Sequence, residues 1–244
     1  MTWQNRYMAR FYPADRGFTT GTRDLWALCS ANSCKSPDRD RVRILEVGAG
    51  PDNQTTEFLA TLGDVHGIDM DPAVLTNRAL SHATVMGGDE RFPVAAGQWD
   101  LCVSDYVLEH VKNPALHFSE VWRVLRPGGA YVFRTPNLRH YVTLVARCTP
   151  HWVHQLVANR LRALPQEAHE PYPAWYRANS RAALRRLSLG VGFRDLSIAM
   201  IEKEPQYGLV ARPLFLAFVA YERAVNLTRL LEGWRANILG VARK

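Results

Sequence analysis

Cysteine is scarce in this chain, and the pattern of the few cysteines excludes two classes of protein. The four cysteines do not have the paired spacing of a zinc site, and they are too few for a small disulfide scaffold. Cys102 falls inside an apolar run that we expect to be a buried strand. We therefore expect reduced thiols in a cytoplasmic protein. The four are Cys29, Cys34, Cys102 and Cys148.

Long apolar runs are also missing. No stretch reaches the roughly 18 apolar residues that a membrane-spanning helix needs. The N-terminal region has no apolar core behind a basic segment, so we expect no secretory signal.

Lysine is the third scarcity, with only Lys35, Lys112, Lys203 and Lys244, so the net charge of +7 and the pI near 9.5 come from arginine. Arginine suits bidentate contacts with phosphate or carboxylate. Two interpretations stay open, a basic bias spread over solvated faces and a functional anion-binding patch. No nucleic-acid recognition module is visible, so we expect no nucleic-acid partner.

A length of 244 residues, with 47% hydrophobic and 22% charged residues, is typical of a globular protein. It allows one well-filled α/β domain with additions, or two small domains.

The stretch from Arg43 to Asp69 predicts a cofactor site. Residues 42–47 form a short apolar run typical of a strand buried in a parallel sheet. Gly48 and Gly50 follow, and they permit a sharp turn and the close approach of a ligand. A helical pattern covers 53–62, and a second strand, 64–69, ends in an acid about 20 residues after the glycines, where it can accept hydrogen bonds from a ribose.

Strands and helices continue to alternate beyond Asp69, which predicts a doubly wound, mostly parallel sheet with its ligands at the carboxyl ends of the strands. We expect further strands at 83–86, 99–104, 130–134, 196–201 and 237–242. We expect helices starting at Pro72, with Val74 and Leu75 buried, and at 114–125, 180–188 and 214–231, the last with Leu214, Phe218, Tyr221, Val225 and Leu231 on its apolar side.

Three segments interrupt this regular alternation. Residues 1–40, with one helix at about 22–30, either form a lid over the cofactor or pack on the sheet. Residues 136–175, with several histidines and arginines and a predicted helix pair, form an insertion assigned to substrate recognition. Residues 203–235 form a helical addition within a main domain of 41–244.

Five motifs in order resemble class I S-adenosylmethionine-dependent methyltransferases acting on small molecules. The resemblance covers about 42–135 continuously and implies a seven-stranded Rossmann-like sheet with an antiparallel last strand. One departure is Asp52 at the third glycine position of the first motif; an acid at a helix N-terminus disfavours a pyrophosphate-bearing cofactor. The motifs are 45–50, 67–71, 88–93, 106–111 and 124–129.

The resemblance implies a set of S-adenosylmethionine-binding residues. Those expected at the methionine part and the sulfonium are Glu46, Gly48, Ala49, Gly50, Ser104 and Asp105. Asp69 is expected at the ribose hydroxyls, and Met70, Asp89 and Glu90 at the adenine.

Methyl transfer needs an aligned nucleophile and, for a hydroxyl, a proton acceptor. His110 and His140 are the candidate bases, because histidine titrates near neutrality and both follow strand ends. We expect no metal, because adjacent residues such as Glu109 and His110 rarely point at one ion and Tyr106 replaces the carboxylate expected three positions earlier.

We expect transfer to a hydroxyl, less readily to an amine or carboxylate, of a small molecule, glycan or glycolipid. Two alternatives stay open: an inactive methyltransferase-like binding subunit and an NAD(P)-dependent oxidoreductase. The arginine-flanked apolar stripe of 212–231 admits peripheral membrane contact or a homodimer face.

Overall fold

The computed structural model describes residues 2–13, 21–148, 173–202 and 205–244. The chain divides into two compact units. One comprises 1–21, 137–172 and 200–237, and the other 22–136, 173–199 and 238–244.

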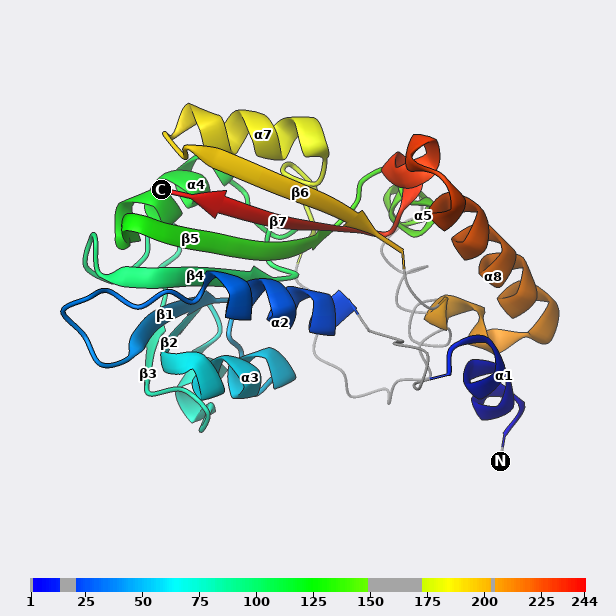
Figure 1. Ribbon diagram of the computed structural model, residues 1–244, viewed down its shortest axis with the longest axis horizontal. Helices are drawn as coiled ribbons and strands as arrows, with labels where there is room; N and C mark the ends of the chain where they lie inside the picture. The colour runs from blue at the N-terminus through cyan, green and yellow to red at the C-terminus, as the bar shows by residue number, and fades with distance from the viewer. Residues whose placement is uncertain (1, 14–20, 149–172, 203–204) are drawn as a thin grey trace. The chain divides into compact units, whose positions relative to one another are not determined.

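A seven-stranded sheet with the strand order β3-β2-β1-β4-β5-β7-β6 forms the core (Figure 1). β1 pairs in parallel with β2 and β4, β2 with β3, and β4 with β5. The predicted fold class is confirmed. The strands are β1 (Val42–Val47), β2 (Gly63–Asp69), β3 (His82–Val85), β4 (Trp99–Asp105), β5 (Leu125–Pro136), β6 (Asp195–Ile201) and β7 (Asn237–Arg243).

β7 runs antiparallel to β5, as predicted. The amide of Gly128, near the start of β5, donates to the Lys244 carbonyl, whereas the amide of Asn137, just past its end, donates to the Ala236 carbonyl. The two strands approach closely at Gly240, where an added Cβ would lie 2.1 Å from Cζ of Phe133. Phe133 is completely buried, so only a glycine fits beside its ring.

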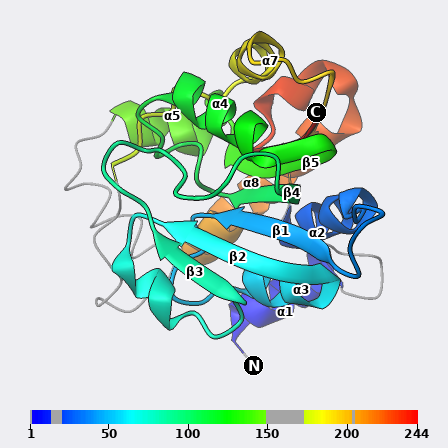
Figure 2. The same ribbon diagram turned by 90° about the vertical axis from the view of Figure 1, so that its left-hand side faces the viewer.

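Helices cover both faces of the sheet, with α4 and α7 on one face and α2 and α3 on the other (Figures 1 and 2). Side chains of Asn53, Asn113 and Ser180 accept hydrogen bonds from the first turns of α3, α4 and α7, which fixes where these helices begin. The helices are α2 (Gly21–Asn32), α3 (Gln54–Leu62), α4 (Pro114–Val124) and α7 (Arg181–Gly190).

Two helix predictions need correction. The segment after β2 is a single 3-10 turn, η2 (Pro72–Thr76), in which Val74 is buried but Leu75 is 61% exposed. The turn ends at Asn77, whose backbone is extended and whose side-chain amide donates to the carbonyls of Ala49 and Gly50. The C-terminal helix α8 (Arg212–Leu227) ends before Thr228, which caps the separate 3-10 helix η4 (Arg229–Trp234).

The predicted apolar side of α8 is correct only in part. Val225 is buried as predicted, and Phe218 and Tyr221 are half-buried and pack against the ring of Tyr141. Leu214 is 37% exposed, Leu231 lies in η4 and is also 37% exposed, and Phe215 and Val219 are buried instead. A periodic pattern does not fix the phase when nearly every position is apolar, as in the run 214–219.

The first unit also contains α1 (Trp3–Phe11), α5 (Tyr141–Cys148) and η3 (Gln206–Val210). The sequence did not predict α1. Its Tyr7 and Phe11 pack their rings edge-on or tilted against Phe215 of α8, with centroids 5.8 and 5.9 Å away. The remainder of the predicted helix pair at 136–175 lies mostly outside the described residues.

Among the described residues, no helix is both long and apolar enough to cross a membrane.

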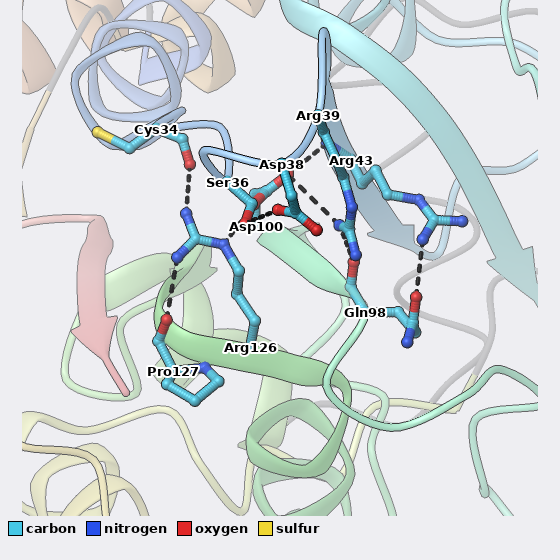
Figure 3. Close-up of polar contacts among 9 residues, drawn as sticks. All are labelled: Cys34, Ser36, Asp38, Arg39, Arg43, Gln98, Asp100, Arg126 and Pro127. Atoms are coloured by element: carbon cyan, nitrogen blue, oxygen red, sulfur yellow. Dashed lines mark hydrogen bonds and ion pairs between the residues drawn. The ribbon is translucent and has the colours of Figure 1, made fainter.

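Asp100, at the start of β4, connects three segments at the edge of the sheet where β1 and β4 begin (Figure 3). Its carboxylate is completely buried; it accepts from the backbone amide of Arg43 at 2.7 Å and from the Arg126 guanidinium. Arg126 also donates to the carbonyl of Cys34. One buried acid thus holds the approach segment, β1 and β5 in register.

Candidate functional site

A cavity of about 360 Å³ lies where β1 and β4 end and α3 begins. It brings together five of the predicted cofactor residues, Glu46, Gly48, Ala49, Gly50 and Asp105. The remaining lining residues are Thr22, Asp52, Asn53, Gln54 and Thr55. The ligand-bearing edge of the sheet is therefore hollowed at the predicted glycine turn.

The glycine turn is built around positive φ angles, 76° at Gly48 and 58° at Gly50. An added Cβ at Gly48 would lie 2.4 Å from Cγ2 of Val107, whereas one at Gly50 would meet nothing within 4 Å. Gly48 is thus required by both its backbone angle and its neighbour, and Gly50 by its angle alone.

Asp69, at the end of β2, is joined to this turn. Its Oδ2 accepts from the amide of Gly50 at 2.9 Å, and its Oδ1 accepts from the amide of Asp71 at 2.9 Å. Its own carbonyl accepts from the amide of Met86, just beyond β3, at 2.7 Å. The acid is half-buried, and carboxylate oxygens have lone pairs for further donors.

Glu46 is the most enclosed acid of the cavity, with 2% of its surface exposed. Within the described part of the chain, its Oε2 has no hydrogen-bond partner, while Oε1 is 3.5 Å from Nδ2 of Asn53. Burial raises the pKa of Glu46 to about 7, and the negative charges of Asp105 and Asp69 act in the same direction. A buried carboxylate oxygen that lacks a donor is suited to receive one from a ligand.

Asp105 is held in place by a bidentate pair with Arg134 of β5, at 2.6 and 2.7 Å. Its Oδ2 also accepts from Oγ1 of Thr55, which in turn accepts from the indole of Trp26 in α2 at 3.3 Å. The adjacent Tyr106 has a φ of 57°, and the Arg134 guanidinium lies 4.4 Å from the centre of its ring. Residues of β5, α3 and α2 therefore fix the Asp105 carboxylate at the cavity wall.

Ser104 is not among the lining residues. Its hydroxyl is completely buried and lies 2.6 Å from the hydroxyl of Tyr131, which is 3.1 Å from Nε2 of His117. Burial lowers the pKa of His117 to about 4, so the imidazole is neutral in this chain of hydroxyls.

The residues expected at the adenine lie beyond β2 and β3. Met70 is 49% exposed, and Asp89 is exposed with Oδ1 accepting from the amide of Arg91 at 3.3 Å. The carboxylate of Glu90 accepts from the amides of Lys112 and Asn113, both at 3.1 Å. Glu90 is thus engaged in holding the start of α4.

The two candidate bases lie in different units. Half-buried His110 places Nδ1 3.1 Å from the carbonyl of Pro173. His140 is 5% exposed, with Nε2 3.3 Å from Oε2 of Glu202 but without hydrogen-bond geometry. Across the described ranges, no three His, Cys, Asp or Glu side chains form a group that could hold a metal ion.

Sequence reasoning missed Thr22, Thr55 and Arg134 as parts of the site. Thr55 could have been predicted, because it lies in the first turn of the helix that Asn53 caps, next to the glycine turn. The sequence carries no signal for Thr22 and Arg134, because Thr22 reaches the cavity wall and Arg134 reaches Asp105 only through long-range packing.

Comparison with known proteins identifies residues 45–133 as a match to the methyltransferase domain family. An uncharacterized methyltransferase of Mycobacterium ulcerans (strain Agy99) is 33% identical over 130 residues, 51% of this chain and 49% of that protein. A probable S-adenosylmethionine-dependent methyltransferase of Mycolicibacterium smegmatis is 31% identical over 97 residues, 38% of each. The chain spans at most about half the length of these relatives.

Among solved structures, a SAM-dependent methyltransferase from Archaeoglobus fulgidus has the same fold. It is 13% identical, with a TM-score of 0.56 and full coverage of both chains.

Proposed function

We propose, from the premise that this chain belongs to the S-adenosylmethionine-dependent methyltransferase family, that it transfers a methyl group to a hydroxyl of a small molecule or glycan. The observation that carries the proposal is the bond between Gly50 and Asp69 beside the cavity that contains Glu46.

The cavity suits the charge of this cofactor. Its lining contains Glu46, Asp52 and Asp105, and among the residues that the structure describes only Asp105 is paired with a cation, Arg134. S-adenosylmethionine carries an ammonium and a sulfonium, so a carboxylate-lined hollow complements it. The same acids repel the pyrophosphate of a nicotinamide dinucleotide, which argues against an oxidoreductase.

Glu46 and the turn residues Gly48, Ala49 and Gly50 would hold the methionine part, with Oε2 of Glu46 accepting from its ammonium. Asp69 would accept from the ribose hydroxyls, and Met70 and Asp89 would lie at the adenine. Ser104 contributes from within the core by fixing the end of β4, and Glu90 contributes by fixing the loop before α4.

The cofactor supplies an activated methyl carbon, so the chain must align the acceptor and receive its proton. As the methyl–oxygen bond forms and the methyl–sulfur bond breaks, the hydroxyl proton passes to a base. We assign this role to His110, because it lies in the same unit as the cavity, five residues after Asp105. His140, also a sequence candidate, belongs to the other unit and is buried against Glu202.

The proposal is tested by titration calorimetry with S-adenosylmethionine, S-adenosylhomocysteine and NADH, followed by a labelled-methyl assay on lysate fractions divided into polar metabolites, lipids and glycans. We expect both sulfur nucleosides to bind and one fraction to accept label. If neither binds, an inactive binding subunit is favoured, and binding of NADH alone would favour the oxidoreductase.

The role of His110 is tested with His110→Gln. We expect kcat to fall by a factor of about 10² to 10⁴, and the decrease of kcat at acidic pH to disappear from the pH profile. The binding of S-adenosylhomocysteine should be unchanged. His82→Gln, an exposed histidine at the start of β3, is the matched control. An unchanged pH profile for His110→Gln would remove the base assignment.

A further inference from the structure

A second cavity, of about 520 Å³, lies between the start of α4 and the helix α7. Three of its lining residues are the cations Lys112, Arg177 and Arg186, and none is acidic. The other lining residues are Asn113, Pro114, Ala115 and Leu187. Cations from three separate segments thus converge on one hollow.

Arg177 is held in position before any ligand arrives. Its guanidinium lies 5.1 Å from the ring centre of Trp175, and its NH1 donates to the carbonyl of Lys112 at 2.5 Å. The amides of Trp175 and Tyr176 donate to the carbonyl of Glu109, which fixes this segment against the loop after β4. A fixed guanidinium loses little entropy when it binds an anion.

The other two cations have exposed side chains that make no hydrogen bond or ion pair within the described ranges. Glu90 accepts hydrogen bonds from the backbone amides of Lys112 and Asn113. Those backbone donors are therefore already used, and the side chains of Lys112, Arg177 and Arg186 supply the charge at the cavity.

We infer that this second cavity binds an anionic group, phosphate or carboxylate, of the methyl acceptor. That the bound anion belongs to a methyl acceptor rests on the proposed function. That the cavity binds an anion does not. The three cations repel each other because no carboxylate lines the cavity. A bound anion would offset this repulsion and accept charge-assisted hydrogen bonds from them. One loop connects the two cavities, from Asp105 in the first to Lys112 in the second, with His110 between them.

Inorganic phosphate is the first probe, titrated at low ionic strength and followed by amide NMR shifts. We expect Arg186→Gln to weaken phosphate binding by about tenfold and Arg177→Gln/Arg186→Gln by more, since each lost charge-assisted bond costs about 1.4 kcal/mol or more. Arg185→Gln is the matched control, because Arg185 is the exposed neighbour on α7 outside the cavity lining. Equal weakening by both single variants, or no binding by the wild type, would overturn the inference.

The second probe is the accepting lysate fraction of the methyl-transfer assay. We expect Arg186→Gln to raise the acceptor KM about tenfold without altering the affinity for S-adenosylhomocysteine, and inorganic phosphate to compete with the acceptor only. Phosphatase treatment that abolishes acceptance identifies a phosphate, and retained acceptance identifies a carboxylate. An acceptor KM unaffected by Arg186→Gln would refute the acceptor role. If the wild type does not bind S-adenosylhomocysteine, the proposed function is refuted, but the result for phosphate binding remains valid.

Discussion

The amide of Gly50 donates a hydrogen bond of 2.9 Å to Oδ2 of Asp69, and this bond joins the turn after β1 to the last residue of β2. The two residues are 19 positions apart along the chain. Asp69 therefore has a structural task in addition to its proposed contact with a ribose, and a variant must separate the two.

Asp69→Ala removes both the acceptor of the Gly50 amide and the proposed acceptor of the ribose hydroxyls. Asp69→Asn keeps an oxygen that can accept from Gly50 but removes the negative charge. We expect S-adenosylhomocysteine to bind at least about tenfold more weakly to Asp69→Asn as well as to Asp69→Ala, because hydrogen bonds to a charged group contribute about 1.5 to 3 kcal/mol. Calorimetry measures this. Asp64→Ala, which removes an exposed acid from the start of β2, should leave binding unchanged. Unaltered affinity in Asp69→Ala would contradict the ribose assignment.

Gly48→Ala should destabilise the fold by about 1 to 3 kcal/mol, because the backbone has a φ of 76° and the new Cβ meets Val107. Gly88→Ala is the control, since φ there is not positive and its Cβ meets nothing within 4 Å. Urea unfolding gives both values. Adding Val107→Ala should recover the part of the loss due to the clash and leave the part due to backbone strain.

Glu46 gives a pH dependence with a defined sign. Its pKa is raised by burial from 4.5 to about 7, so the folded state binds the proton more tightly than the unfolded state does. Its contribution to stability is complete below about pH 4.5 and is lost as pH rises through 7. We expect the free energy of unfolding of Glu46→Gln, relative to that of the wild type, to be about 1 to 3 kcal/mol higher at pH 8 than at pH 5. Unfolding curves at the two pH values test this; a constant difference would show that Glu46 ionises normally.

Asp100→Asn should reduce the free energy of unfolding by about 3 kcal/mol, because it leaves the partly buried Arg126 without its carboxylate. The exposed pair of Asp195 and Arg243 provides the comparison, and Asp195→Asn should cost less than about 1 kcal/mol. Denaturant titrations of both variants decide the matter. Similar losses would mean that burial of Asp100 does not determine its importance.

Much of the sheet was predictable because local composition decides it. β1 coincides with the predicted range 42–47, since an apolar run bounded by charges and glycines admits one register. The pairing of Gly50 with Asp69 was also foreseeable, because parallel strands bring their carboxyl ends to one edge.

Other features depend on distant parts of the chain and could not be predicted. The bidentate contact between Asp105 and Arg134 requires β4 and β5 to be adjacent, which neither segment encodes alone. The side chain of Ser104 faces Tyr131 because alternate residues of a strand point to opposite faces, and sequence alone does not say which face carries the site. η2 likewise ends at Asn77, whose side chain donates to the carbonyls of Ala49 and Gly50, a contact between segments distant in the sequence.

The narrow gap between Gly240 and Phe133 has a consequence for mutational selection. If position 240 were randomised, folded clones should retain glycine almost without exception, because any methyl group would have to displace a completely buried ring. Position 233, where an added Cβ meets nothing within 4 Å, should accept many residue types. The attachment of β7 to the sheet thus depends on the absence of a side chain.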